Sequence, residues 1–257
     1  MRLISWNVNG IRAVERKQDL QSFLQDWQPD ILLLQETKAK PEQLSALLTQ
    51  HPEYHQFYHA AQQPGYSGTA IWARKDKIAT PQFQSGMPDF DDAEGRVAQL
   101  DFLDYSILGV YFPNGGKSPE AWQGKLVFYE RFLAYVNQLR ADGRKVIWGG
   151  DVNCAHQPID LARPQDNEQS IGFLPEERDW VSRVIAQDWV DIFRQRNPTT
   201  VIYSWWHVIT KARARNIGWR IDYFFVDSCL QPQVSNSQYL NQQLGSDHCP
   251  VLLELEL

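Results

Sequence analysis

Short apolar runs typical of buried β-strands recur along the whole chain, and this repetition limits its possible folds more than any other feature. The runs are residues 2–8, 30–35, 68–74, 96–102, 105–112, 144–150, 220–226 and 250–257. Helical patterns lie between several of them, at residues 16–27, 41–50, 119–141 and 175–187. Strands and helices mixed in this way predict a layered α/β or α+β domain.

No composition break divides the chain into parts. Its 257 residues suffice for one large domain with a buried core or for two small domains. We find no repeat array, low-complexity linker or long Pro/Gly/Ser stretch between the runs. The sequence therefore predicts a single domain over residues 1–257.

The charge distribution is uneven. The net charge of −6 argues at face value against a polyanionic partner, but binding depends on local charge. Lys211, Arg213, Arg215 and Arg220 fall within ten positions that contain no acidic residue. An acidic body with one basic stripe suits a protein that grips a phosphate backbone on one face.

The cysteines and the hydropathy pattern bear on the compartment. Cys154, Cys229 and Cys249 form no CxxC pair and indicate neither a disulfide framework nor a zinc site. No apolar run has the length of a membrane span, and the N-terminus lacks a signal-peptide layout. We expect a cytoplasmic protein that does not bind membranes.

The stretch GGDVNCAH, residues 149–156, ends one of the apolar runs with two polar side chains, Asp151 and Asn153. If the strand persists, residues two apart point to the same side, and the double glycine lets the backbone bend or approach another group. A carboxylate and a carboxamide facing one space are a plausible catalytic pair. Alternatively, they cap backbone groups of a loop.

Other strand-like runs also end in polar groups, which a shared sheet edge would gather into one site. These groups are Asn7 and Asn9, Gln35 and Glu36, Tyr111 and Asn114, Asp222, and Asp247 with His248. Glu36 with Asn7 suits Mg²⁺, which prefers oxygen ligands, although a glutamate is also favourable at a helix N-terminus.

His248 is the histidine with a suggestive setting. Asp222 or Asp247 is available to orient its ring and stabilise the protonated form. An imidazole held in this way can polarise a phosphoryl oxygen or position water. The other histidines, which are interpreted as surface or packing residues, are His51, His55, His59, His156 and His207.

The motifs together resemble the exodeoxyribonuclease III and apurinic/apyrimidinic endonuclease family. They run in order over nearly the entire chain and include SWNVNGIRA (5–13), LLQETK (33–38), GDVNCAHQPIDLARP (150–164), ARARNIGWRIDYFFV (212–226) and GSDHCP (245–250). WNVNG and SDH are shared with the wider superfamily of metal-dependent phosphodiesterases, whereas IDLARP and NIGWRIDYF are specific to DNA-repair nucleases.

The resemblance implies a four-layered α/β (α+β) sandwich of two mixed β-sheets flanked by helices. It implies a Mg²⁺- or Mn²⁺-dependent enzyme that hydrolyses the phosphodiester 5′ to an abasic site and leaves a 3′-hydroxyl. It also implies 3′→5′ exonuclease and 3′-end clean-up activity. The expected partner of the monomeric protein is double-stranded DNA with abasic or 3′-damaged sites.

The resemblance also implies roles for individual residues. Glu36 is the main metal ligand, and Asn7, Asp247, Asp151 and Asn153 complete the metal environment. Asp151 orients or deprotonates the attacking water and Asn153 holds a phosphate oxygen. Tyr111 contacts the scissile phosphate, as does His248, which Asp222 orients. The side chains implied to contact DNA are Arg12, Lys38, Tyr66, Asn114, Lys117, Asn167, Trp205, Ile209, Arg213, Trp219 and Ile221.

Two departures from the family pattern, one over residues 207–209 and one at Lys117, leave the balance of activities open. His207 and Val208 stand where many relatives carry Ser or Thr followed by Tyr, and Ile209 takes the place of the side chain that wedges into the duplex. Lys117 replaces an arginine, giving a point charge in place of a planar fork. Some relatives also nick beside uracil or damaged bases.

Two alternatives come from other classes of protein. A superfamily phosphodiesterase acting on a lipid or inositol phosphate would share the catalytic groups, but it has no evident use for IDLARP or the basic stripe. An inactive DNA-binding protein on the same scaffold is disfavoured because none of the expected catalytic positions is vacant.

Overall fold

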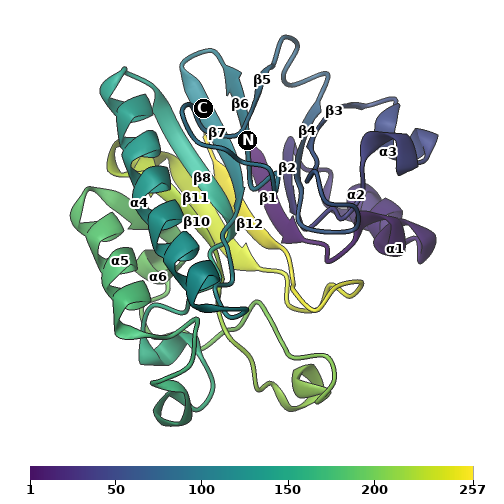
Figure 1. Ribbon diagram of the computed structural model, residues 1–257. Helices are drawn as coiled ribbons and strands as arrows, with labels where there is room; N and C mark the ends of the chain where they lie inside the picture. The colour runs from purple at the N-terminus through teal and green to yellow at the C-terminus, as the bar shows by residue number, and fades with distance from the viewer. Residues whose placement is uncertain (257) are drawn as a thin grey trace.

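The computed structural model describes residues 1–256, and within this part the strands form two six-stranded sheets (Figure 1). The first sheet has the order β11-β12-β1-β2-β4-β3. Its strands are β1 (Arg2–Asn7), β2 (Ile31–Gln35), β3 (Tyr54–His59), β4 (Thr69–Arg74), β11 (Val234–Tyr239) and β12 (Val251–Leu255).

The second sheet has the order β5-β6-β7-β8-β10-β9. Its strands are β5 (Gln82–Ser85), β6 (Val97–Phe102), β7 (Tyr105–Tyr111), β8 (Lys145–Asp151), β9 (Trp189–Asp191) and β10 (Asp222–Asp227). Both sheets are mixed, because β1 pairs with β2 and β7 with β8 in parallel while the other pairs are antiparallel.

Helices cover the outer face of each sheet (Figure 1). The first sheet carries α1 (Ile11–Arg16), α2 (Asp19–Trp27) and α3 (Ala46–Thr49), and the second carries α4 (Pro119–Ala141) and α5 (Pro175–Ala186). The short α6 (Ile192–Arg196) packs against strands of both sheets, and its Ile192 and Phe193 join the core between them. Short 3₁₀ segments are Pro41–Gln43, Pro158–Asp160, Pro164–Asn167, Ala212–Arg215 and Ser228–Gln233. This arrangement confirms the expected four-layered sandwich.

The alternation of side chains along each strand explains the layers. In β1, Leu3 joins the core between the two sheets, whereas Ile4 and Trp6 join a second core under α1 and α2. In β8, Ile147 points between the sheets and Trp148 packs against the helical layer of α4 and α5. Both faces of each sheet are therefore buried, so the strands read as nearly continuous apolar runs.

The longest helix follows the sequence pattern. α4 spans residues 119–141, as expected, with Pro119 in its first turn and Ser118 as a cap that accepts a hydrogen bond from the Ala121 N–H. Phe128, Phe132 and other side chains of its apolar stripe are buried. The stripe holds α4 against the second sheet.

Each expected strand has a counterpart, but two of the helical predictions were wrong in detail. The chain breaks between α1 and α2 because Gln18 adopts a left-handed conformation at φ 62°. Residues 41–50 form a 3₁₀ turn and the short α3 instead of one helix. The strands without an expected counterpart are β3, β5, β9 and β11, and each lies at a sheet edge.

The strand directions bring polar ends to one edge of the sandwich. Asn7 of β1 pairs with Gln35 at the end of β2, and Tyr111 of β7 pairs with Asp151 at the end of β8. β10 runs antiparallel to β8, so it begins at this edge with Asp222 opposite Asp151. Within residues 1–256 no helix is long and apolar enough to cross a membrane.

Candidate functional site

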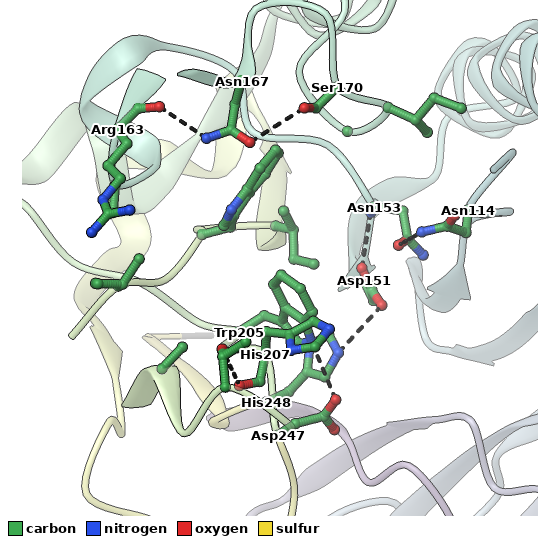
Figure 2. A pocket seen from close by; sticks show the side chains of 18 of the residues that line it. Asn114, Asp151, Asn153, Arg163, Asn167, Ser170, Trp205, His207, Asp247 and His248 are labelled. Carbon is green, nitrogen blue, oxygen red and sulfur yellow. Dashed lines mark hydrogen bonds and ion pairs between the residues drawn. The ribbon is translucent and has the colours of Figure 1, made fainter. Parts of the chain in front are cut away.

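An open cavity of about 750 Å³ lies at this edge of the sandwich. Figure 2 shows Asp151 of β8 and side chains from several loops turned into it, and Glu36, which follows β2 of the first sheet, lines it as well. The expected site residues that line it are Glu36, Tyr111, Asn114, Asp151, Asn153, Asn167, Trp205, Trp219, Ile221, Asp247 and His248.

The GGDVN stretch reaches the cavity by a sharp change of backbone direction. A Cβ at Gly150 would lie 1.8 Å from the Val110 carbonyl oxygen, so this position needs glycine for close approach to β7. β8 ends at Asp151, and Asn153 has a left-handed φ of 54°. Asp151 and Asn153 do face a common space, but the expectation that an extended strand places them there was wrong.

Asn7 joins two carboxylates that are far apart in the sequence. Its Nδ2 donates hydrogen bonds of 2.9 Å to Glu36 Oε1 and 2.9 Å to Asp151 Oδ2. Its Oδ1 accepts the backbone N–H of Asn9 at 3.0 Å, which fixes the direction of the amide. Asn7 and Asp151 are buried and Glu36 is nearly so, which makes this a rigid, weakly solvated arrangement.

His248 forms a buried pair with Asp222, as expected, and not with Asp247. Its Nδ1 lies 2.9 Å from Asp222 Oδ2, and its Nε2 lies 3.8 Å from Asp151 Oδ2 (Figure 2). Burial lowers the pKa of His248, but the carboxylates of Asp222 and Asp151 outweigh it and the net pKa is raised. The ring is therefore an imidazolium at neutral pH.

Asp151 and Tyr111 have pKa values raised by the same surroundings. Burial, followed by the charge of Asp222, raises the pKa of Asp151 against the opposing effect of His248. Burial and the charge of Glu36 raise the pKa of Tyr111 well above its usual value. Tyr111 therefore stays protonated and offers an O–H donor to the cavity.

Asn153 and Asp247 are held by hydrogen bonds to neutral groups. Asn153 Nδ2 donates to the Phe112 carbonyl at 2.9 Å, and its Oδ1 accepts from Asn114 Nδ2 at 3.2 Å. Asp247 accepts Asn9 Nδ2 at 2.9 Å and the Trp205 indole N–H at 3.1 Å. These bonds fix both side chains at the cavity wall.

The donor set fits a hard divalent cation. Atoms of Glu36, Asp151 and His248 lie within 4.8 Å of one another and could enclose an ion. The carboxylates of Glu36 and Asp151 are oxygen donors of the kind that Mg²⁺ and Mn²⁺ prefer. The imidazolium of His248 is a poor ligand, so the two carboxylates are the better candidates. Asp247 lies outside this cluster.

Basic and polar side chains expected at the DNA surface surround the cavity. Lys38 Nζ lies 2.8 Å from Glu36 Oε2, and an Arg12 guanidinium N–H donates to the Lys38 carbonyl at 3.4 Å. Lys117 Nζ lies 4.3 Å from the centre of the Tyr66 ring, in a neighbouring cavity of about 330 Å³. All four side chains have exposed surface.

Asn167, Ile209 and Arg213 occupy different environments. Asn167 donates to the Arg163 carbonyl and accepts from Ser170 at the far side of the cavity (Figure 2). Ile209 projects from its loop with 88% of its surface exposed, as a wedge requires. The guanidinium of Arg213 instead donates hydrogen bonds to the backbone carbonyls of residues 241, 243 and 246, so it anchors the loop before Asp247.

An apolar wall completes the cavity. Leu161, Phe173 and Ile221 are buried in one cluster, and the partly buried Trp205 and Trp219 pack against it. Asp222, the next residue after Ile221, lies on the opposite side of the chain and reaches the site through His248. The alternation along this segment therefore separates the apolar wall from the catalytic groups.

Several residues that line the cavity were missed from the sequence. His207, interpreted as a surface or packing residue, is exposed, and it also borders the cavity beside Trp205 (Figure 2). Arg163 and Arg215 also line it. Arg163 lies within IDLARP and Arg215 within the basic stripe, so both motifs carried a signal that was not assigned to the site.

Comparison with known proteins defines the class. A family described as the endonuclease/exonuclease/phosphatase family matches residues 4–248. The chain belongs to this family, which confirms the resemblance drawn from the motifs and identifies the protein as a hydrolytic enzyme.

Individual relatives are similar over their whole length or nearly so. An exodeoxyribonuclease of Bacillus subtilis is 40% identical over 259 aligned positions that cover 100% of both chains. The DNA repair nuclease APEX1 of Danio rerio is 37% identical over 99% of this chain and 82% of its own. The crystal structure of an AP endonuclease from Leishmania major matches with a TM-score of 0.91 and 28% identity, covering 100% of this chain and 87% of that one.

Proposed function

We propose that the protein is a DNA-repair nuclease that hydrolyses the phosphodiester on the 5′ side of an abasic site in double-stranded DNA. The products are a 3′-hydroxyl and a 5′-deoxyribose phosphate. The similarity to the Bacillus exodeoxyribonuclease, the zebrafish repair nuclease and the Leishmania AP endonuclease supports DNA as the substrate.

One observation carries this proposal. The buried carboxylate, amide and imidazolium groups border the same cavity as the apolar wall of Trp205, Trp219 and Ile221. A deoxyribose without a base is small and is extruded from the duplex at little cost in stacking. The wall offers such a sugar an apolar surface while its phosphate meets the charged end of the cavity.

Mg²⁺ or Mn²⁺ is the proposed cofactor, held by Glu36 and Asp151, with Asn7, Asn153 and Asp247 close by. A bound divalent ion supplies Lewis acidity and neutralises the negative charge of the phosphodiester. Asn7 contributes by fixing both carboxylates through its hydrogen bonds of 2.9 Å.

Asp151 is proposed to orient and deprotonate the attacking water. Its Oδ1 accepts the Asn153 backbone N–H at 2.8 Å and its Oδ2 accepts from Asn7, which leaves lone pairs directed at the cavity. The water oxygen attacks phosphorus and gives one proton to Asp151, while the bond from phosphorus to the 3′ oxygen breaks. The departing 3′ oxygen takes a proton from solvent and becomes the 3′-hydroxyl, and Asp151 then returns its proton to solvent.

His248, Tyr111 and Asn153 are proposed to bind the phosphate oxygens. His248 Nε2–H carries positive charge that Asp222 maintains, and the Tyr111 O–H is a neutral donor. Asn153 Nδ2 donates one hydrogen bond to the Phe112 carbonyl and has a second N–H available for the phosphate. Donors fixed in advance around a developing anion are the largest catalytic contribution in many hydrolases.

The remaining DNA-contact residues are proposed to grip the backbone around the site. Lys38 pairs with Glu36 and is contacted by Arg12. Tyr66 and Lys117 line the neighbouring cavity, and Asn114 and Asn167 line the main one. Ile209 is exposed, and Arg213 is proposed to act by anchoring the loop before Asp247. Contacts to phosphate fix the register of a duplex without reading its sequence. We further propose 3′→5′ exonuclease and 3′-end clean-up activity at the same site, since a terminal nucleotide presents the same phosphate chemistry.

The broader predictions go with this function. We propose that residues 1–257 act as one catalytic domain and that the protein works as a monomer. The free cysteines Cys154, Cys229 and Cys249 fit a reducing compartment, which supports a cytoplasmic location.

The test is a Mg²⁺-dependent digest of matched duplexes that carry an abasic site, a uracil or an undamaged blunt 3′ end. We expect the abasic duplex to be nicked fastest, on its 5′ side, and the reaction to stop in excess chelator. A faster reaction beside uracil would favour the alternative substrate. Full strand scission in chelator, or hydrolysis of a phospholipid head group in place of DNA, would contradict the proposal.

A further inference from the structure

A fully buried ion pair lies behind the site and has no part in the catalytic set described above. It joins Lys125 of α4 to Glu177 of α5, and both side chains have 0% exposed surface. Removing two charges from water is unfavourable unless the pair is well arranged and its remaining donors and acceptors are satisfied. The partners of these two side chains therefore indicate what the pair does.

Lys125 contacts the backbone of both amide residues at the site. Its Nζ donates to the Asn153 carbonyl at 2.9 Å and to the Asn114 carbonyl at 3.2 Å, in addition to Glu177 Oε1. The three donors of the ammonium group are thus all used. Because Asn153 has a left-handed backbone, the direction of its carbonyl and that of its side chain are set together.

Glu177 contacts the loop that forms the opposite wall. Its Oε2 accepts the backbone N–H of Gly172 at 2.6 Å and of Leu174 at 3.0 Å. Gly172 packs closely on the indole of Trp219, since a Cβ at this position would lie 3.2 Å from the ring. Its carbonyl accepts the Ala155 N–H at 2.7 Å, which ties this loop back to the GGDVN segment.

We propose that Lys125 and Glu177 are positioning residues of the nuclease site. The pair fixes the positions of three loops relative to one another. The amides of Asn114 and Asn153 then face the phosphate, and the wall at Gly172 and Trp219 faces the sugar. It acts through these residues and does not touch DNA. The kinetic part of this inference rests on the proposed function, whereas its structural part does not.

The same two helices supply a matched control. Arg183 of α5 and Glu130 of α4 form a second ion pair between α4 and α5, with side chains that are 51% and 57% exposed. This pair links the helices on their outer surface. Replacing either glutamate by glutamine removes one charge from an ion pair between α4 and α5, but only Glu177→Gln alters the loops of the site.

The experiment compares Glu177→Gln with Glu130→Gln in the full-length protein. A glutamine at 177 keeps one acceptor for Lys125 but cannot also accept both loop N–H groups. We expect kcat for abasic-site cleavage to fall about 10-fold or more, since an error of about 1 Å in position costs up to 10²-fold. Hydrogen exchange of the amides in residues 172–174 is expected to accelerate. Glu130→Gln is expected to leave both measurements unchanged.

A double-mutant cycle with Asn153→Ala separates positioning from a general loss of structure. If the pair acts through Asn153, the effect of Glu177→Gln on kcat shrinks to less than about 3-fold in the Asn153→Ala background. An equal loss in both backgrounds, or a normal kcat despite accelerated exchange, would overturn the proposal. If the wild-type protein does not cut abasic duplex, the proposed function is rejected. The positioning proposal is then tested by the hydrogen exchange of residues 172–174 alone.

A second variant covers the case in which Glu177→Gln does not fold. Lys125→Met with Glu177→Met replaces the pair by apolar side chains of similar length, a change that buried ion pairs often tolerate. We expect this double variant to fold and to lose the same activity, because the carbonyls and N–H groups of the three loops lose their partners. A folded double variant with wild-type kcat would rule the positioning role out.

Discussion

Replacing Asp151 by Asn tests the catalytic assignment and the electrostatics of the site together. The substitution keeps the shape of a side chain that is 1% exposed and removes its charge. An amide cannot take the proton of the attacking water, and general-base catalysis is worth about 10²–10⁴ in rate. We therefore expect cleavage of abasic duplex to fall by about this factor, while DNA binding is retained.

The same substitution is expected to stabilise the protein when no divalent ion is bound. Burial and the Asp222 charge raise the pKa of Asp151 from 3.8 to about 7. Because the folded-state pKa is higher than the unfolded one, the folded state loses stability as pH rises from 3.8 through 7. At pH 8 the ionised carboxylate thus destabilises the fold by at most roughly 4 kcal/mol.

This limit already includes the favourable interaction of the carboxylate with the His248 imidazolium. For a chain of this size it corresponds to a rise in Tm of at most about 8–16 °C. The matched control is Asp160→Asn, at a buried aspartate paired with Arg220 at 2.7 Å and Arg194 at 2.6 Å. Breaking such a pair costs about 3–5 kcal/mol, so this variant should melt about 10 °C lower.

The assays are nicking of an abasic duplex in Mg²⁺, gel-shift affinity, and thermal unfolding at pH 8 in excess chelator. Near-normal nicking by Asp151→Asn would refute the role of this carboxylate as the proton acceptor. A fall in Tm like that of Asp160→Asn would instead show that Asp151 is a structural anion whose charge the fold requires.

Three further predictions address the phosphate-binding groups and the DNA surface. Asp222→Asn should lower the pKa of His248, because the carboxylate that stabilises the imidazolium is lost. The alkaline limb of the kcat/KM–pH profile should then move to lower pH, and an unchanged profile would argue against an active imidazolium. Lys117→Ala should weaken DNA binding and reduce the slope of log affinity against log salt concentration by about one, as measured by titration at several salt concentrations. Ile209→Ala should weaken binding to abasic duplex without changing Tm, because the side chain is 88% exposed; equal binding would remove it from the role of wedge.

Much of the fold was readable because its signals are local. The central strands are buried on both faces and read as apolar runs, and α4 has a cap, an early proline and an apolar stripe. The edge strands were missed because they depend on one neighbour for their pairing and carry mixed sequences. β5 is QFQS and β11 is VSNSQY, and neither has an alternation that distinguishes it from a loop.

Site residues were predicted best where a motif follows a buried strand. The break at Gln18, the left-handed backbone of Asn153 and the position of His207 were not readable. At Asn153 the conformation depends on contacts with distant segments and not on neighbours in sequence. This residue is held by the Phe112 carbonyl, by Asn114 and by Lys125.

Local sequence patterns show which chemical groups stand at the ends of strands and what family of enzyme they indicate. How these groups meet depends on the tertiary structure. Asn7 bonds Glu36 across 29 positions and Asp151 across 144, and Lys125 reaches Glu177 across 52. Side-chain patterns report local conformation, whereas contacts over such distances depend on the pairing and packing of whole sheets. The paired strands and the packed sheets therefore bring the acid, amide and imidazole groups to one cavity.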